Sequence, residues 1–407
     1  MQKTYRTTAK ILPKKSGKSW FSKAVAWIHL WPSLVSAVIL IFVCLTGTII
    51  VYCDEIMEFS AGRARFVEQV GTQRLEPDEL IEQLKAQFPD RGTPGYMVAY
   101  KDPSRSVRFN MFSKKEGLRM VYVDPYTGQV LKDDGTIYFF YITAHLHNSL
   151  LLHKPGQWII DIATLIFLIE LITGLILWWP RKWTKATRDA SFKIKWKAKF
   201  KRINYDLHNV LGFYALGISL VLTVTGLIIA FHPWAEFTLK LFGGNPSHEW
   251  MDTLSEHRGD ATPASVNATL ASLFAQHPQK REAIVYTYSF GKQGHYLLSL
   301  AKSAGLKSAE GAEPFAIDRY SGRPIELAHE NRMHLLVENT YWNLHMGKWM
   351  GQWGKFFTFV GGLIATSLPI TGFYIWWGRR RKHKKRPTQR KRKALNTTAD
   401  TLTHPGV

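Results

Sequence analysis

The sequence has very little cysteine and lacks the short motifs that mark many soluble enzymes. Its two cysteines, Cys44 and Cys53, lie nine residues apart on one predicted helix, which separates them by about 13 Å and excludes a disulfide between them. No CxxC, HExxH or serine–histidine–aspartate signature occurs, and no glycine-rich nucleotide loop lies between a predicted strand and a helix. The sequence therefore gives no indication of thiol chemistry or of an NAD(P)H or ATP site.

Apolar residues, by contrast, form four long runs, at residues 33–52, 162–179, 210–231 and 356–377. Each run is close to the ~20 residues that a helix needs to cross a bilayer core about 30 Å thick. Tryptophans such as Trp31, Trp178 and Trp377 flank the runs, and their amphipathic rings favour the headgroup level of a membrane. The sequence therefore predicts four membrane-spanning helices.

The formal net charge of +22 comes mostly from three short segments. Residues 1–23 have seven Lys or Arg and no acid, residues 181–202 have ten with one acid, and residues 379–393 have eleven with none. Acids and bases nearly balance in the polar stretches 54–146 and 233–350. This positive-inside pattern predicts cytoplasmic termini and external polar stretches. It explains the basic tail by stop-transfer and lipid attraction, so we expect no nucleic-acid partner.

The chain begins with basic residues before an apolar run, as secretory signals do. The run is long and no clean small-residue cleavage site follows it, so we expect an uncleaved signal anchor. The predicted segments are a basic cytoplasmic arm (1–23), a first span (24–53), an external domain (54–146), a second span with its entrance segment (147–180), a basic cytoplasmic loop (181–206), a third span (207–232), a second external domain (233–344), a fourth span with its entrance segment (345–378) and a basic, disordered cytoplasmic tail (379–407).

The chain up to residue 378 reads as one unit written twice. His29 in the first copy matches His208 in the second, and His147 in a HLHNSLL segment matches His345 in a NLHMGKW segment. Both copies enter the membrane in the same direction, so they are predicted to be parallel repeats whose spans form one bundle. Matching histidines are then expected at equal depth, His29 with His208 near the cytoplasm and His147 with His345 near the outside.

The external stretches also repeat. Each has a helical segment followed by alternating apolar and polar segments, and the turn VDPYTGQ of the first stretch matches IDRYSGR of the second. An Asp followed by a Gly between apolar runs is typical of a hairpin, because the carboxylate caps the turn and Gly adopts a positive φ. The sequence therefore predicts two small α+β domains, each with one helix over an antiparallel sheet.

These features together resemble a known family. The repeated hairpins are similar to PepSY domains, and spans with LH at the entrance, TG near the far end and WW before a basic stop resemble PepSY-associated transmembrane proteins. The resemblance covers about residues 24–380. It implies a multi-pass protein of the bacterial inner membrane with two PepSY-like external domains, linked to iron uptake, in a family that includes haem-containing ferric-siderophore reductases.

Paired histidines on facing helices are the usual way in which a membrane bundle holds b-type haem. We therefore predict two haems, one bound by His29 and His208 and the other by His147 and His345, noncovalently because no CxxCH motif occurs. Gly47 and Gly226 are expected to face the external haem, and Gly174 and Gly372 the cytoplasmic one. Helix packing is the alternative reason for these glycines.

Other ionisable residues are weaker candidates for functional sites. His153 and His232 are substitutes for the external pair, and His145 has no matching histidine. A metal site among the external histidines lacks compact ligand spacing; these residues are His248, His257, His277, His295, His329 and His334. Glu170 lies inside a span and is expected to face the bundle interior.

The function that follows is a haem-b electron-transfer protein that reduces ferric iron, held in a siderophore, at the external face. An electron donor protein or a quinone would supply the electrons, and no side chain is needed as acid or base. The alternatives are a non-enzymatic PepSY protein that binds or inhibits an external partner such as a peptidase, and a siderophore permease. The permease is disfavoured because four spans without a run of buried polar residues offer little pathway.

Overall fold

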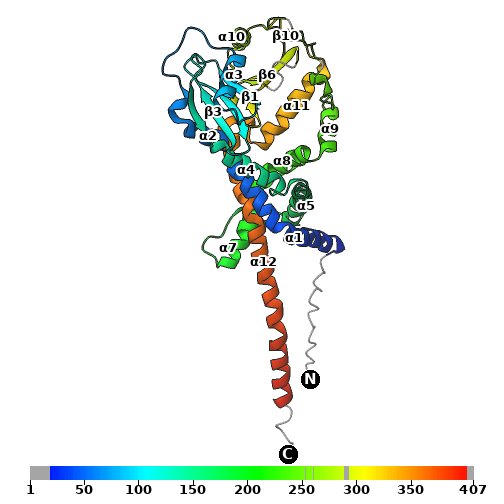
Figure 1. The fold of residues 1–407 in the computed structure, drawn as a ribbon. Coiled ribbons are helices and arrows are strands. Elements are labelled where there is room, and N and C mark those ends of the chain that lie inside the picture. Colours follow the sequence, from blue (N-terminus) through cyan, green and yellow to red (C-terminus); the bar gives the residue numbers. More distant parts are fainter. Residues whose placement is uncertain (1–18, 253, 260, 288–292, 401–407) are drawn as a thin grey trace, which may run out of the picture.

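The computed structural model describes residues 19–252, 254–259, 261–287 and 293–400, with side chains up to Arg380. A helix bundle lies below a domain built on one β-sheet in the view of Figure 1. Residues 1–18, most of the predicted cytoplasmic arm, lie outside the described part of the chain. The last helix is assigned as far as Asp400, and disorder in residues 379–407 stays a prediction.

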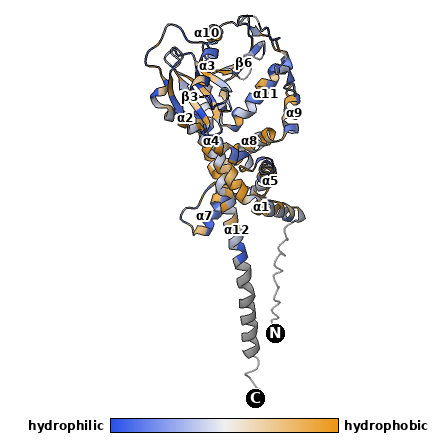
Figure 2. Cartoon of the chain, viewed as in Figure 1, coloured by the Kyte–Doolittle hydropathy of each residue, from blue (hydrophilic) through white to orange (hydrophobic). Residues whose placement is uncertain are grey.

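In the described part of the chain, four helical segments are long and apolar enough to cross a membrane, in agreement with the predicted number. They are Trp20–Ile50 (α1), His153–Trp178 (α5), Phe200–Ala230 and Lys348–Arg380. The third comprises α7 (Phe200–Asp206), a π-helical turn (Leu207–Leu211) and α8 (Gly212–Ala230), and the fourth comprises a 3-10 turn (Lys348–Met350) and the start of α12 (Gly351–Asp400). Figure 2 shows these segments as the most apolar region of the chain, as expected of a multi-pass membrane protein.

The spans pack as a four-sided bundle. Helix α1 contacts α5 and α12, and α8 contacts the same two helices, so α1 and α8 occupy opposite corners. Apolar side chains fill the middle of the bundle, namely Leu40, Ala163, Phe167, Leu171 and Ala365. Side chains that face outward stay exposed, among them Val35 and Val38, because lipid is their solvent.

Among the described residues, the domain above the bundle contains one eight-stranded antiparallel sheet, in the order β10-β9-β6-β5-β1-β2-β3-β4. The strands are β1 (Tyr96–Tyr100), β2 (Val107–Ser113), β3 (Gly117–Val123), β4 (Val130–Asp134), β5 (Glu282–Tyr286), β6 (His295–Ala301), β9 (Glu313–Asp318) and β10 (Pro324–Ile325). A short hairpin, β7 (Ser303–Ala304) and β8 (Ala309–Glu310), stands apart from this sheet.

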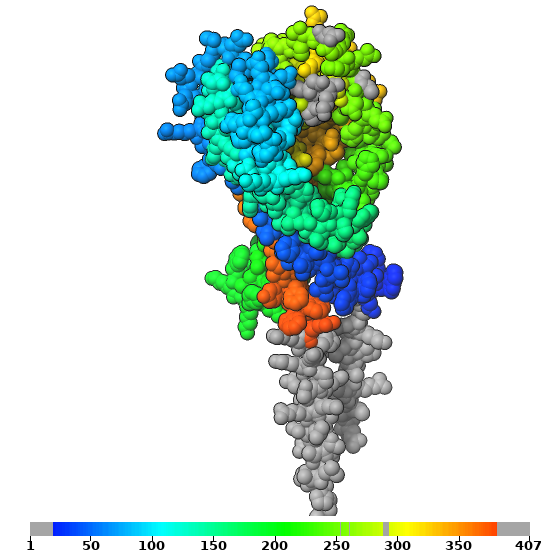
Figure 3. Space-filling model, in the orientation of Figure 1, coloured from blue at the N-terminus to red at the C-terminus, as the bar shows by residue number. Residues whose placement is uncertain are grey.

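The single sheet corrects the prediction of two separate α+β domains. Strand β1 of the first half pairs with β5 of the second along its whole length, from Tyr96 opposite Tyr286 to Tyr100 opposite Glu282. Each of these strands would otherwise be a sheet edge with unpaired backbone groups, and pairing removes both edges. Figure 3 shows the two halves side by side, in blue to cyan and in green to yellow.

One apolar core also joins the two halves. Helices α3 (Pro77–Gln87) and α10 (Val266–Gln276) both pack on the sheet, and their buried side chains belong to one cluster with those of β1, β2, β5 and β6. The Glu76 carboxylate begins α3 with a capping box and also accepts a hydrogen bond from the Val266 amide at the start of α10 (2.9 Å). The two halves therefore form one folding unit.

The Asp–Gly hairpin turns are formed as predicted. Asp124 accepts a hydrogen bond from the Tyr126 amide (2.8 Å), and Asp318 accepts one from the Ser321 amide (2.8 Å). Gly128 and Gly322 complete these turns with φ of 76° and 65°, which only glycine adopts without strain. The turns connect β3 to β4 and β9 to β10, the strands that lead to the bundle.

Short helices join the sheet to the spans. They are α2 (Cys53–Ala61), the 3-10 turn Gly62–Arg65, α4 (Thr136–Ser149), α9 (His232–Leu241), the 3-10 turn Glu249–Asp252 and α11 (His329–His345), while α6 (Lys185–Phe192) lies between the second and third spans. Cys53 begins α2 after α1 has ended at Ile50, so the expectation that both cysteines share one helix was wrong. Both cysteines are free thiols.

Buried ion pairs fasten the sheet domain to the bundle. The Lys348 ammonium lies 2.7 Å from an Asp54 carboxylate oxygen and donates to the Ser308 carbonyl at 2.8 Å. The other Asp54 oxygen accepts a hydrogen bond from the Leu306 amide (3.1 Å). Lys348 and Asp54 are 6% and 14% exposed, so these charges depend on each other for stabilisation. The segment around β7 and β8 is thereby held against the top of the spans.

Candidate functional site

The structure brings His29 and His208 together in the bundle. His29 lies on α1 and His208 in the π-helical turn between α7 and α8, and their ring centroids are 6.5 Å apart with the planes at 72°. We call these two residues the terminal-side pair, because they lie toward the end of the bundle away from the sheet.

His147 and His345 form a second pair, which we call the sheet-side pair. Their ring centroids are 6.1 Å apart with the planes at 53°. Both residues were predicted at span entrances, but they lie near the ends of the preceding helices, α4 and α11. Tight turns separate them from their spans: Leu150 and Leu151 have positive φ after α4, and Gly347 has φ of 72° after α11.

Every histidine of the two pairs is hydrogen-bonded through Nδ1 to a threonine hydroxyl of a neighbouring span. The contacts are His29 with Thr173 (3.1 Å), His208 with Thr371 (3.0 Å), His147 with Thr46 (3.3 Å) and His345 with Thr225 (3.0 Å). Each threonine is followed by glycine, in the TG dipeptide near the far end of each of the four spans. These threonines were not identified as site residues from the sequence, although the fourfold TG pattern was the signal that could have found them.

The direction of these hydrogen bonds fixes the histidine tautomer. Each threonine hydroxyl donates its single proton to a carbonyl of its own helix, as Thr173 does to Ile169 (2.7 Å) and Thr225 to Val221 (2.7 Å). The threonine oxygen must then accept from the imidazole, so Nδ1 carries the proton. Nε2 is left with a free lone pair, which is the state of a histidine that binds a metal.

The glycines after these threonines make room for the same imidazoles. A Cβ atom built on Gly47 would lie 2.8 Å from His147 Cε1. The corresponding distances to Cε1 are 3.3 Å from Gly174 to His29, 3.2 Å from Gly226 to His345 and 3.2 Å from Gly372 to His208. The glycines therefore lie at the predicted levels, but the group that they accommodate directly is an imidazole ring.

The spacing within each pair suits two ligands of one metal ion. Two imidazoles that bind a metal from opposite sides place their ring centroids about 6 Å apart, because each metal–nitrogen bond is about 2.0–2.1 Å and the nitrogen lies about 1 Å from the ring centre. The observed 6.5 Å and 6.1 Å agree with this value. Together with the free Nε2 lone pairs, the spacing fits a bis-histidine haem iron at each level.

The two levels are separated by the apolar middle of the bundle. His29 and Thr46, which contacts the other pair, are seventeen residues apart on α1, or about 25 Å along its axis. Both histidine pairs and their supporting threonines lie in the interior of the bundle that α1, α5, α8 and α12 form. The bundle therefore has two histidine sites near its ends, and the apolar cluster of Leu40, Ala163, Phe167, Leu171 and Ala365 lies between them.

Glu170 faces the bundle interior, as predicted for an acid inside a span. It is 8% exposed, and its carboxylate accepts a hydrogen bond from Ser36 of α1 (3.3 Å). The Thr173 hydroxyl, which supports His29, also reaches the Glu170 carbonyl (3.3 Å). The buried carboxylic group of Glu170 therefore lies within about one helical turn of Thr173, the residue that supports His29.

The remaining predicted histidines lie elsewhere. His232 pairs with Glu236 (3.1 Å) on the exposed side of α9, His153 begins α5, and His145 contacts the Tyr141 ring. None of the three is needed to complete the sheet-side pair.

One further cluster was missed by sequence reasoning. In the described part of the chain, His248, His334 and Glu338 form a group whose ligand atoms all lie within 4.8 Å of one another. The i,i+4 spacing of His334 and Glu338 was the available signal.

A multi-pass membrane bundle with interior histidine pairs and an antiparallel sheet beyond one end of the bundle defines the class of this protein. The chain belongs to the family described as the PepSY-associated TM region, whose model matches residues 26–379. No curated protein matches the sequence.

Proposed function

We propose that this protein is a di-haem electron-transfer protein of the bacterial inner membrane that reduces ferric iron, held in a siderophore, on the side of the sheet domain. The observation that carries the proposal is the presence of two inter-helix histidine pairs with identical threonine and glycine support. A structural histidine needs a hydrogen-bond partner, but it does not need a second imidazole at a metal-binding distance, twice, in matched positions.

His29 and His208 would hold one haem b, and His147 and His345 the other. Haem, when bound, supplies one-electron transfer. The task of this chain is to keep the imidazoles in one tautomer, through Thr46, Thr173, Thr225 and Thr371, and to exclude water with apolar helices. No side chain has to act as a general acid or base in this reaction.

The basic segments support the orientation. The loop 181–202 lies between the second and third spans, and residues 379–393 follow the fourth. With these segments in the cytoplasm, both termini are cytoplasmic and the sheet domain faces the periplasm. Electrons would enter near the terminal-side pair from a donor protein or a quinone and leave near the sheet-side pair.

The order of elements supports two PepSY-like units that arose by parallel duplication. Each half has a helix, an antiparallel set of strands that ends in an Asp–Gly hairpin, and a helix that leads to a histidine of the sheet-side pair. In this proposal the two units, joined by the pairing of β1 with β5, form the domain that covers the sheet-side pair.

The proposed chemistry is the release of iron from a chelate. One electron converts Fe(III) to Fe(II), which binds hard oxygen ligands less strongly, so the siderophore loosens its hold. Trp349 and Trp353 lie near the top of the fourth span with 45% and 66% exposure, and we propose them as contacts for the chelate. An interfacial aromatic belt explains the same exposure, and the two roles can coexist.

Reoxidation in oriented vesicles tests this function. Dithionite-reduced protein should be reoxidised by a membrane-impermeant ferric siderophore added on the side of the sheet domain, and much less by the same chelate confined to the other side. The matched control is His345→Ala, which should keep the terminal-side haem and lose most of the response. Equal reoxidation from both sides would refute the direction, and no reoxidation from either side would refute the function.

A further inference from the structure

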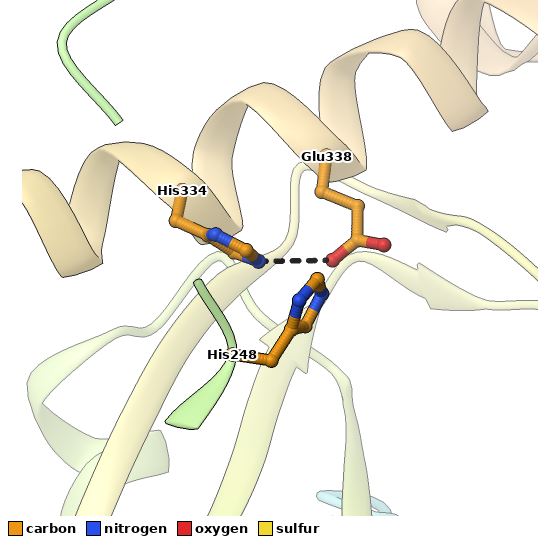
Figure 4. A group of neighbouring side chains, drawn as sticks. All are labelled: His248, His334 and Glu338. Atoms are coloured by element: carbon orange, nitrogen blue, oxygen red, sulfur yellow. Dashed lines mark ion pairs between the residues drawn. The ribbon is translucent and has the colours of Figure 1, made fainter. Parts of the chain in front are cut away.

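The cluster of His248, His334 and Glu338 has the composition of a metal site outside the bundle. His334 and Glu338 are one turn apart on α11, and His248 reaches them from the segment after α9 (Figure 4). The ring centroids of the two histidines are 4.5 Å apart, and a Glu338 carboxylate oxygen lies 3.7 Å from His334 Nε2. All three side chains converge on one point.

His334 is an unsatisfied buried group. Its side chain is 1% exposed, and its Nδ1 is hydrogen-bonded to the Asn245 carbonyl, so Nδ1 carries a proton. Nε2 has no hydrogen-bond partner among the described residues. If the ring is neutral, the lone pairs of His334 Nε2 and of the Glu338 oxygen face each other without a proton between them. If Nε2 is protonated, the distance of 3.7 Å between these two atoms is too long for a hydrogen bond. A cation between the neutral ring and the carboxylate would accept both lone pairs and remove the conflict.

The surroundings hold the cluster in place. The Asn245 amide donates to the Glu330 carbonyl (2.9 Å), and its side chain donates to the Asn331 side-chain oxygen (2.9 Å), so the segment that carries His248 is fastened to the first turn of α11. Gly244 allows this approach, since a Cβ there would lie 3.1 Å from the His334 backbone nitrogen. On the other side, Tyr341 donates to the second Glu338 oxygen (3.4 Å).

Two imidazole nitrogens and one carboxylate oxygen form a ligand set that suits Fe(II) and other divalent first-row metals, with positions left for water. Bonds of about 2.1 Å require ligand atoms about 3–3.5 Å apart. The present spread of up to 4.8 Å closes by a movement of His248, which is exposed and therefore free to turn. Fe(III), by contrast, prefers the hard oxygen ligands of a chelate.

The cluster shares a helix with the sheet-side pair. Eleven residues separate His334 from His345 on α11, or about 16 Å along the helix axis. We propose that His248, His334 and Glu338 bind one Fe(II) ion, the product of the reduction, beside the site where it forms. The role as product site rests on the proposed function, whereas binding of a divalent metal by these three side chains stands on its own geometry.

The test is Fe²⁺ binding under anaerobic conditions to the full-length, detergent-purified protein, measured by equilibrium dialysis with Zn²⁺ as a competitor and with haem quantified in the same sample. Wild-type protein should bind one Fe²⁺ beyond its haem iron. His248→Ala and Glu338→Gln should weaken this binding at least about 10-fold while haem content stays unchanged, and His329→Ala, at the start of the same helix, should bind as wild type does.

The outcomes separate this proposal from the proposed function. Absence of bound Fe²⁺, or variants that bind as the wild type does, would overturn the site even if the protein contains haem and reduces ferric chelates. Binding of Zn²⁺ without Fe²⁺ would overturn the product role. A haem-free protein that still binds one Fe²⁺ through these residues would support the site and refute the proposed function. Since His248 is exposed, its variant is informative even if substitution of the buried His334 prevents folding.

Discussion

His29 and His208 belong to the spanning segments themselves, whereas His147 and His345 lie on α4 and α11, which descend from the sheet domain. The immediate support is the same at both levels: a threonine hydroxyl on Nδ1 and a glycine against the ring. What differs is the origin of the helix that carries each imidazole. The terminal-side pair therefore depends on the bundle alone, and the sheet-side pair depends on the bundle and the sheet domain together.

This difference indicates that the two pairs respond differently to changes in the sheet domain. Packing of α4 on β3 and of α11 on β9 and β8 lets the sheet domain influence the sheet-side pair. Binding or loosening in that domain can reach His147 and His345 without crossing the apolar middle of the bundle. In our proposal the terminal-side pair, where electrons would enter, is carried by the spanning segments and is therefore less affected by the same events.

Removal of single histidines should have the largest effect, because each substitution should abolish haem binding at one of the two levels. We expect His29→Ala and His208→Ala to lose the same haem, and His147→Ala and His345→Ala to lose the other, because in our proposal the two histidines of each pair bind one iron. Optical spectra of the reduced variants at low temperature would separate the two haems. His145→Ala, on the same helix as His147, is the matched control and should keep both. Grouping of His29 with His147 would contradict the two-level arrangement.

Loss of the Asp54 charge should affect the sheet-side pair alone. Asp54→Asn leaves the buried Lys348 ammonium without its partner, a change that costs about 3–5 kcal/mol for a buried ion pair. On heating, the sheet-side haem spectrum should disappear well before that of the terminal-side haem. Glu82→Gln removes an exposed pair with Lys85 and serves as the control, with an effect below about 1 kcal/mol. If both haems were lost together, the proposed independence of the pairs would be wrong.

Replacement of a supporting threonine should weaken one site without abolishing it. Thr225→Val keeps the shape of the side chain and removes the hydroxyl acceptor of the His345 Nδ1 proton, while the Leu222 carbonyl stays. We expect the sheet-side haem to be held about 10- to 100-fold less tightly, as for other partners of metal-binding histidines. Haem loss to an excess of an apo-globin measures this change, and Thr225→Ser should restore retention. Retention equal to wild type in Thr225→Val would show that the hydroxyl does not hold the ring.

The smallest expected effect is a pH dependence of the sheet-side pair. Burial alone would raise the pKa of Asp134, but hydrogen bonds from Thr136, Ser60 and Lys132 lower it to about 2. A depressed carboxyl pKa gives stability that is present above the unfolded value of about 4 and is lost as the pH falls toward 2. Solvent screening reduces this contribution to about 1 kcal/mol, and because Asp134 leads into α4 it should act on His147 first. Thermal unfolding between pH 5 and 2.5 measures it, and Asp134→Asn should flatten that dependence.

The sequence was sufficient to predict the four spans and the pairing of the histidines. Span number follows from apolar length, and His29 with His208 and His147 with His345 follow from the rule that parallel repeats place equivalent residues at equal depth. The fused sheet was not predicted, because edge pairing between β1 and β5 joins strands that are almost two hundred residues apart and leaves no local pattern.

The contacts between side chains were predicted less well than the depth of each histidine in the bundle. The TG dipeptides were recognised as a repeat, but the direction of a threonine hydroxyl depends on how two helices face each other, which the sequence does not specify. His248 and His334 are separated by an intervening half-sheet, so no spacing rule could join them. In both cases the missing information was three-dimensional contact between elements that the sequence had located correctly.

The haem content of the purified protein decides whether the two histidine pairs bind haem. A pyridine haemochrome assay on detergent-solubilised protein from a haem-supplied host, with protein quantified by amino-acid analysis, should give two haems b per chain. Substitution of one histidine from each pair, as in the double variant His29→Ala with His345→Ala, should give none. Colourless wild-type protein, or a double variant that keeps its haem, would contradict the account.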